Sequence, residues 1–373
     1  MGSGNIDQCP DIKQKTINNN IMKKIFFSLL ALAAIAACSK SNIEYADNQM
    51  EISFAPVSKV NTKAAITLTD YPDALDMYVF AEAGEPNVEV TGDNYDPYFK
   101  NALFQHGSNA DNVFSGATPY YWPNVKKLIF SGLSASGNVN AKDDPDTAED
   151  EKGAIPTYAY NTTALEWQIT LEGYTPTAGT ETLGNNDLMW FSTVGPFAKP
   201  ATQRDWTVDA IMKHACAWVT INIKGDATTG KTGTTWQILD LTIADLAQKG
   251  DVVLGTAASW KNLSEVKTFD VYEATTGKAL TDNYVDYTQL TYKDLVVIPQ
   301  SAKTLTVTYS FVSDPVNNIT TKEVKEIPLT FDGGKNWEAG KHYIYNITIG
   351  TQEIIIHPKA QDWTVVTAPD IVL

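Results

Sequence analysis

The sequence is short of cysteine, of positive charge and of long apolar runs. Three of its 373 residues are cysteines, and 28 lysines and arginines stand against 44 aspartates and glutamates. The net charge of −16 argues against a nucleic acid partner, because such binding needs a basic surface. No apolar run reaches the length of about 18 residues that predicts a membrane-spanning helix.

The sequence also lacks the signatures of common catalytic and metal sites. None of its four histidines is spaced from another histidine or a cysteine as metal ligands are, and neither G-x-S-x-G nor a phosphate-binding loop is present. The acidic segment at Asp143, Asp144 and Asp146 lacks the glycine and distal glutamate of a calcium loop, so a solvated loop is the stronger interpretation. We therefore predict a protein that is not an enzyme and has no cofactor or metal site.

The segment from Met22 to Cys38 reads MKKIFFSLLALAAIAAC and has three parts. Two lysines precede an apolar run, and small residues follow it, which is the pattern of a secretory signal peptide. The run is about half the roughly 20 residues that a spanning helix needs. Residues 1–21 are polar, so we expect Met22 to be the true start and residues 1–21 to be an upstream extension.

The end of this segment, IAAC at residues 35–38, resembles the lipobox of bacterial lipoproteins. That resemblance implies cleavage before Cys38 and attachment of several acyl chains to it, which anchors a protein firmly to a membrane. The alternative is an ordinary signal peptide that happens to end at a cysteine. A lipidated Cys38 would leave Cys216 without a disulfide partner, and the apolar run at residues 215–219 makes Cys216 a buried core residue.

After this leader the pattern is that of β-strands. Hydrophobic residues make up 43% of the chain and aromatic residues 10%, which is ample for packed cores. Short runs rich in threonine, valine and tyrosine alternate with turns of glycine, asparagine, aspartate and proline, which favours β-sandwiches over α/β layers. Only residues 244–249 are compatible with a short helix. The segment at residues 195–200 holds two prolines and a glycine, so we expect a domain boundary between residues 195 and 215.

Both ends of the mature chain have strand patterns. Met50–Phe54 alternates apolar and polar residues, and a segment with Lys59 and Lys63 follows it, which is either a protease target or a plain exposed loop. The runs at 354–356 and 363–366 are two further strand candidates. A terminal strand normally lies at a sheet edge, and an exposed edge invites pairing unless a partner covers it.

Nine tryptophans suggest an alternative function. Trp167 and Trp218 lie in apolar strand patterns and are predicted to be core residues, whereas Trp260 and Trp337 lie in turn-like contexts and are candidates for exposure. Exposed tryptophans would suit a glycan-binding surface lipoprotein of a nutrient-uptake system, which is the alternative to the function given below.

Taken together, several short segments resemble a fimbrillin-type lipoprotein of the Bacteroidetes, of the Mfa-like or FimA-like group. They are IAAC at 35–38, ISF at 52–54, TKA at 62–64, YYWP at 120–123, DLM at 187–189, MKHA at 212–215, LVVIPQ at 295–300 and WEAGKHYIY at 337–345. The resemblance covers nearly the whole mature chain.

The resemblance implies an all-β fold with two tandem transthyretin-like β-sandwich domains after a lipoprotein signal peptide. The expected division is 1–37 for the extension and signal peptide, 38–63 for a tether and removable N-terminal strand, 64–205 for the first sandwich and 206–373 for the second.

It further implies a pilus subunit, at the shaft, the tip or the anchor, that supports cell adhesion. The precursor would be anchored in the outer membrane through Cys38. A trypsin-like protease would cut between Lys63 and Ala64, or less readily after Lys59, and remove the strand at residues 50–54. The strand of a neighbouring subunit would fill the groove that remains, so that subunits join into a fimbrium at the cell surface. The donor strand would be drawn from residues 354–373, whose apolar members are Ile354, Ile355, Ile356, Val365, Val366, Ile371 and Leu373.

Overall fold

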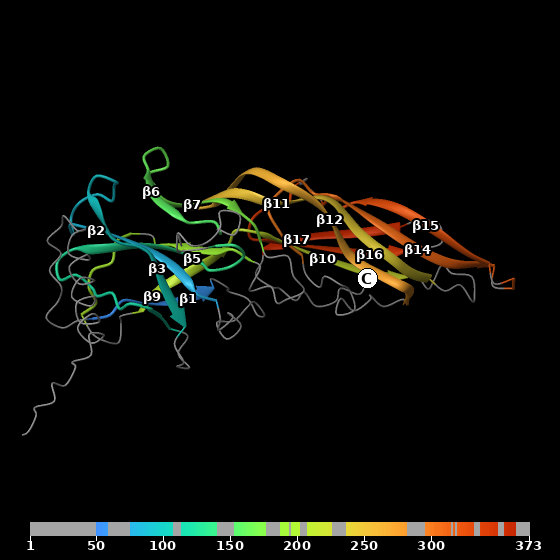
Figure 1. Ribbon diagram of the computed structural model, residues 1–373, viewed down its shortest axis with the longest axis horizontal. Coiled ribbons are helices and arrows are strands. Elements are labelled where there is room, and N and C mark those ends of the chain that lie inside the picture. The colour runs from blue at the N-terminus through green and yellow to red at the C-terminus, as the bar shows by residue number, and fades with distance from the viewer. Residues whose placement is uncertain are drawn as a thin grey trace, which may run out of the picture. The chain divides into compact units, whose positions relative to one another are not determined.

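The structure is a computed structural model of the chain. It describes residues 50–58, 75–106, 113–139, 153–176, 187–193, 195–201, 207–225, 236–281, 295–314, 316–317, 319–331, 336–349 and 354–362. Every regular element within these ranges is a β-strand (Figure 1), which confirms the prediction of an all-β fold.

Seven strands form a closed barrel in the order β1-β4-β3-β2-β5-β8-β9. They are β1 (Ser53–Ser58), β2 (Met77–Gly84), β3 (Tyr95–His106), β4 (Phe114–Gly116), β5 (Lys127–Ser134), β8 (Met189–Ser192) and β9 (Thr207–His214). The barrel interior is aromatic, because Phe54, Phe104, Phe130 and Phe191 are all 2% exposed or less. Gly132 is needed for this packing, since a Cβ there would lie 2.4 Å from Cε1 of Phe191.

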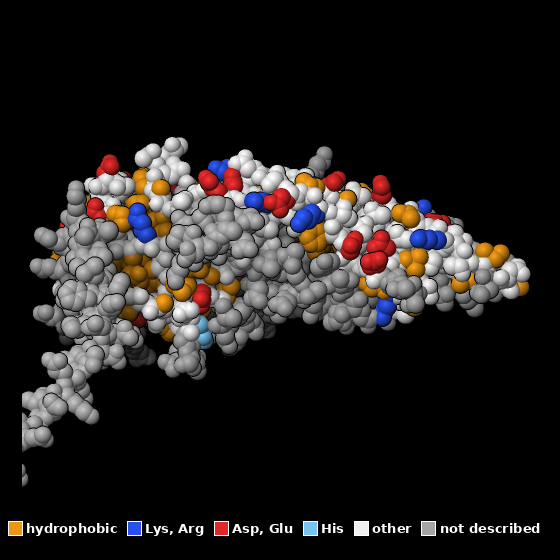
Figure 2. All heavy atoms as spheres, in the orientation of Figure 1, with side chains coloured by type: hydrophobic (Ala, Val, Ile, Leu, Met, Phe, Trp, Pro, Cys, Tyr) orange, Lys and Arg blue, Asp and Glu red, His pale blue; other side chains and the backbone are white. Residues whose placement is uncertain are grey.

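A second sheet has the order β15-β14-β11-β7-β6, with β12 paired to β11 outside this path. Its strands are β6 (Thr157–Asn161), β7 (Glu166–Tyr174), β11 (Trp236–Leu254), β12 (Ala258–Leu280), β14 (Thr304–Asp314) and β15 (Ile319–Pro328). On the face drawn in Figure 2, acidic and basic side chains are interspersed over these strands. An ion pair on this sheet joins Lys249 Nζ on β11 and Glu265 Oε1 on β12 at 3.2 Å.

The third sheet has the order β13-β10-β16-β17. Its strands are β10 (Ala217–Gly225), β13 (Leu295–Val297), β16 (Lys341–Ile349) and β17 (Ile354–Asp362). In β10 and β16 buried residues alternate with half-buried ones, so each strand turns one face to a core. That core also contains buried residues of β11 and β14, and the two sheets therefore pack face to face as a sandwich.

The long strand β11 takes part in two pairings on the same edge. Residues 236–243 pair with β14 and residues 250–254 pair with β7. Between these two stretches, the register of β11 against β12 shifts between Ile243 and Leu246, and Asp245 has a φ of 59°. The short helix considered for residues 244–249 is therefore wrong, because this segment is the irregular middle of a strand.

Strands from both sides of the expected domain boundary share one sheet. β7 ends at Tyr174, β11 begins at Trp236, and the two pair antiparallel. β9 begins at Thr207 and lies in the barrel. The division at residues 205 and 206 stays a prediction.

Candidate functional site

The candidate site is the place of β1 in the barrel wall. β1 pairs parallel with β9, from Ser53 opposite Thr207 to Ser58 opposite Met212. On its other side it pairs antiparallel with β4 at Ser53 and Phe54. β1 therefore has a partner strand on each side, and its removal would leave unpaired backbone groups along both neighbours.

The side chains of this strand region fill the barrel interior. Ile52 and Phe54 are both 0% exposed. The ring of Phe54 contacts Phe104 and Phe130 edge-on, with centroids 4.9 and 5.1 Å apart, and Phe191 at 5.6 Å. Full burial of such a side chain stabilises a fold by about 1.5–3 kcal/mol. Without β1 the barrel would therefore have an open apolar groove.

The segment YYWP at residues 120–123 holds the start of this strand region. The backbone N–H of Ile52 donates to the carbonyl of Tyr120 at 2.7 Å, and that of Trp122 donates to the carbonyl of Met50 at 2.9 Å. Glu51 and Tyr121 form an antiparallel bridge. Two segments that support the family resemblance, residues 52–54 and 120–123, are thus neighbours in space.

Three residues predicted from the sequence at the N-terminal side, Cys38, Lys63 and Ala64, lie outside the described residues. The described chain stops at Ser58 and resumes at Leu75, which is 4% exposed. Lipidation at Cys38 and cleavage after Lys63 stay predictions.

The predicted donor region begins with β17. All nine residues of β17 pair antiparallel with β16, from Lys341 opposite Asp362 to Ile349 opposite Ile354. β17 is the last strand of its sheet, so within the described ranges its outer edge has no strand partner. Ile354, Ile355 and Ile356 lie in this strand. The other donor residues, Val365, Val366, Ile371 and Leu373, lie outside the described residues.

Two further segments of the resemblance meet at the end of the barrel. Asp187, just before β8, and His214, the last residue of β9, join through a hydrogen bond between Oδ2 and Nδ1. Asp187 is 2% exposed, and burial raises the pKa of its carboxyl, while His214 and the backbone N–H of Cys216 act in the opposite direction. Cys216 is free and 0% exposed, which confirms its prediction as a core residue, and burial raises the pKa of its thiol.

The structure corrects the prediction for the two candidate exposed tryptophans. Trp337 is 1% exposed, and its Nε1 donates to the hydroxyl of Tyr345 at 2.9 Å. Trp260 is half-buried, and its Nε1 donates to the carbonyl of Ala215 at 2.7 Å. Trp337 is therefore a core residue. The indole N–H groups of Trp337 and Trp260 both donate to protein acceptors and are not available to a ligand.

Two other kinds of functional element are absent from the described ranges. They contain no group of three or more histidine, cysteine, aspartate or glutamate side chains that could hold a metal ion. They also contain no helix long and apolar enough to cross a membrane.

Comparison with known proteins gives a family and a set of similar folds. The model of a fimbrillin-like family matches residues 37–363. A fimbrial protein from Bacteroides vulgatus has a similar structure, with a TM-score of 0.58 and 16% identity, over 84% of this chain and 99% of that one. No curated protein sequence matches the chain.

Two other solved structures are more distantly similar. The tip fimbrial protein Mfa3 from Porphyromonas gingivalis has a TM-score of 0.41 and 10% identity, over 84% of this chain and 98% of that one. A fimbrial assembly protein from Parabacteroides distasonis has a TM-score of 0.38 and 12% identity, over 86% and 97%. Because the family model matches well over half of its length, the chain belongs to the fimbrillin-like family.

Proposed function

We propose that this chain is a fimbrial subunit that polymerises by exchanging its own strand β1 for a strand of a neighbouring subunit, and that the fimbrium supports cell adhesion. The observation that supports this most is the burial of Ile52 and Phe54 in a barrel whose wall β1 completes. A strand in that position leaves an apolar, hydrogen-bonding groove when it is removed.

The first step is hydrolysis of one peptide bond. In the precursor, Cys38 carries the lipid that holds the chain in the outer membrane. A trypsin-like protease cuts between Lys63 and Ala64 and so separates the anchor and β1 from the rest. Since β1 is held by non-covalent contacts alone after the cut, it can leave the barrel.

The second step is strand addition. A strand from residues 354–373 of a neighbour enters between β4 and β9, where main-chain hydrogen bonds give affinity and alternate apolar side chains occupy the places of Ile52 and Phe54. β17 is suited to this because it is bonded on one edge only within the described chain. Subunits joined head to tail in a contact that does not close form a filament.

Limited trypsin treatment of the folded precursor tests both steps. Cleavage after Lys63, read by N-terminal sequencing, is expected to produce a ladder of oligomers in size-exclusion chromatography. Lys63→Gln should prevent both the cleavage and the ladder of oligomers. Lys59→Gln is the matched control and should leave the cleavage after Lys63 and the ladder unchanged. Truncation before residue 354 should allow cleavage but abolish the ladder. A full-length precursor that is cut but stays monomeric would contradict the proposal, as would a ladder that forms equally well without residues 354–373.

The alternative of a glycan-binding lipoprotein for nutrient uptake rested on exposed tryptophans. With Trp337 in the core and Trp260 bonded to Ala215, that argument no longer supports it.

A further inference from the structure

Strand β15 forms one margin of its sheet. It comes first in the order β15-β14-β11-β7-β6, so one of its edges pairs with β14, and the other has no strand partner among the described residues. An edge of this kind presents a row of backbone N–H and C=O groups that can pair with another strand. The outer edge of β15 is therefore a candidate contact surface.

β15 lacks the irregularities that commonly block an edge. Its register against β14 is unbroken from Thr320 to Pro328, and none of its ten residues has a positive φ. By contrast, the register of β12 against β11 shifts at four places, and Asn262 and Glu265 of β12 have φ values of 54° and 53°. Such bulges twist an edge away from a neighbouring chain, so β12 is protected from pairing whereas β15 is not.

The middle of β15 carries charges of both signs. Successive residues of a strand point to opposite faces, so Lys322, Val324 and Glu326 share one face. Glu323 and Lys325 share the other face. Glu323 is half-buried and the other four residues are exposed, including the apolar Val324 at 57%. Lysines alone on an edge would repel a second strand, but here each lysine is accompanied by a glutamate.

Two copies paired antiparallel about Val324 bring opposite charges together. Residues at equal distances before and after Val324 then lie opposite each other. Lys322 meets Glu326 of the partner subunit, and Glu323 meets Lys325 of the partner subunit, so that each pair occurs twice. The two copies of Val324 meet at the centre, which removes exposed apolar surface from water. Cross-strand pairs of opposite charge stabilise a sheet.

The neighbouring registers are disfavoured by like charges. A strand presents only alternate backbone groups outward, so two identical edges pair about a residue, and the register changes in steps of two. A pair centred on Glu323 or Lys325 would place that charge opposite its own copy. A further step, to Lys322 or Glu326, would do the same. Because like charges directly opposite each other destabilise a sheet, the order of charges selects the register centred on Val324.

Contacts within one chain leave these groups able to pair. Glu323 Oε2 accepts a hydrogen bond from the hydroxyl of Tyr309 at 2.8 Å and lies 3.2 Å from Lys325 Nζ. Lys322 is also attracted to Asp240 of β11. Since an ammonium has three donors and a carboxylate has two acceptor oxygens, each of these charges can add a partner across the contact.

We propose that two copies of this chain associate side by side by pairing the outer edges of β15, antiparallel and centred on Val324. The sheets that contain β15 then form one continuous sheet. Such a contact uses the same surface on both copies and closes at two copies, so it does not by itself extend a filament. It goes beyond the head-to-tail assembly described above and does not depend on cleavage.

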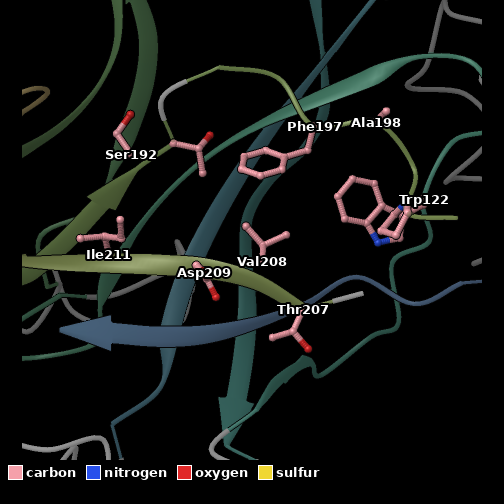
Figure 3. A pocket seen from close by; sticks show the side chains of 10 residues that line it. Trp122, Ser192, Phe197, Ala198, Thr207, Val208, Asp209 and Ile211 are labelled. Atoms are coloured by element: carbon pink, nitrogen blue, oxygen red, sulfur yellow. The ribbon is translucent and has the colours of Figure 1, made fainter. Parts of the chain in front are cut away.

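The contact uses none of the strands assigned to strand exchange. β1 runs along β9 in the barrel (Figure 3), and β17 lies in the third sheet. The two contacts therefore do not compete for a strand, and subunits of two fimbriae can pair laterally. One pair of strands is a small interface and binds weakly, but many such contacts between two filaments reinforce one another.

Sedimentation equilibrium of the uncut precursor, purified without protease, tests the proposal. Without cleavage no strand exchange takes place, so the result is independent of the proposed polymerisation. The average mass is expected to rise from monomer towards dimer between about 5 µM and about 500 µM, since a contact of this size should have a dissociation constant of about 100 µM. A precursor that remains monomeric over this range would overturn the proposal.

Two charge reversals on one face of β15 locate the contact. Lys322→Glu and Glu326→Lys each place like charges opposite each other, so each should weaken self-association at least tenfold while the melting temperature stays within a few degrees. An equimolar mixture of the two variants restores opposite charges at both positions and should dimerise again.

The matched controls are Lys267→Glu on β12 and Glu89→Lys. Both positions are exposed and lie outside β15, and the two substitutions change the net charge by the same amounts as the β15 variants. Neither control should alter self-association. Equal weakening by the controls and the β15 variants would overturn the proposal, as would β15 variants that associate like the wild type or a mixture that stays monomeric.

Discussion

Glu82 is the most unusual single residue of the barrel. It is 1% exposed on β2, and its Oε2 has no hydrogen-bond partner among the described residues. Burial raises the pKa of its carboxyl from 4.5 to about 8, with Lys100 opposing this and Asp96 adding to it. The phenol of Tyr158 faces the same region, and burial raises its pKa as well.

This carboxyl should make the folded state less stable as the pH rises. The folded state holds the proton of Glu82 more tightly than the unfolded state does, so the stabilising effect is complete below pH 4.5 and is lost as the pH rises to about 8. Glu82→Gln removes the titration. The melting temperature of this variant minus that of the wild type should therefore increase between pH 5 and pH 9, and a constant difference would contradict the assignment.

At the residue scale, the prediction of burial from the strand pattern succeeds for some residues and fails for others: Trp167 is 8% exposed as expected, whereas Trp218, also predicted to be a core residue, is half-buried. Cys216 lies between two alanines and is buried as expected. Trp337 lies between Asn336 and Glu338, which suggests a turn, but the acceptor for its N–H is the hydroxyl of Tyr345 in the next strand. A pairing of side chains eight positions apart across a turn leaves no periodic signal in the sequence.

At the scale of elements, the contribution of β1 to stability can be measured both in the uncut precursor and in the assembled subunit. Phe54→Ala should lower the unfolding free energy of the uncut precursor by about 3–5 kcal/mol, because it removes a ring at the centre of the aromatic core. The assembled subunit has lost β1 under our proposal, so its stability should not change. Chemical denaturation of both forms measures this.

Val324→Ala is the control for this experiment, since Val324 is 57% exposed on β15 and its truncation should cost within about 0.5 kcal/mol. An equal loss for Phe54→Ala in the precursor and in the polymer would mean that β1 stays in place after assembly.

The strands themselves are largely predictable, and their partners are not. Alternation at 50–54, 165–171 and 343–349 marks segments that lie in or beside β1, β7 and β16. Nothing local indicates that β1 lies beside β9, since Ser53 and Thr207, whose hydroxyls bond at 3.4 Å, are 154 positions apart. Pairing over such distances is decided by packing of the whole barrel.

At the scale of the whole molecule, the Asp187–His214 bond lies where the chain passes from the barrel to the sheet that contains β10. His214→Ala would leave the buried Asp187 carboxyl without its side-chain partner, which should cost at least about 1–3 kcal/mol. Thermal unfolding of the precursor measures the loss. Lys249→Ala, which breaks the exposed pair with Glu265, is the comparison and should cost less than about 1 kcal/mol. Equal effects would show that burial of Asp187 is unimportant.

The direction of β1 has a consequence for the polymer. β1 runs parallel to β9 and antiparallel to β4. Under our proposal, a replacement strand that restores the same ladder of hydrogen bonds would run in the same direction along the groove, so all subunits would be oriented alike. The two tips of such a fibre would then differ chemically, since one would present a vacant groove and the other an unused donor strand. A subunit would add to the first tip through its donor strand and to the second through its groove.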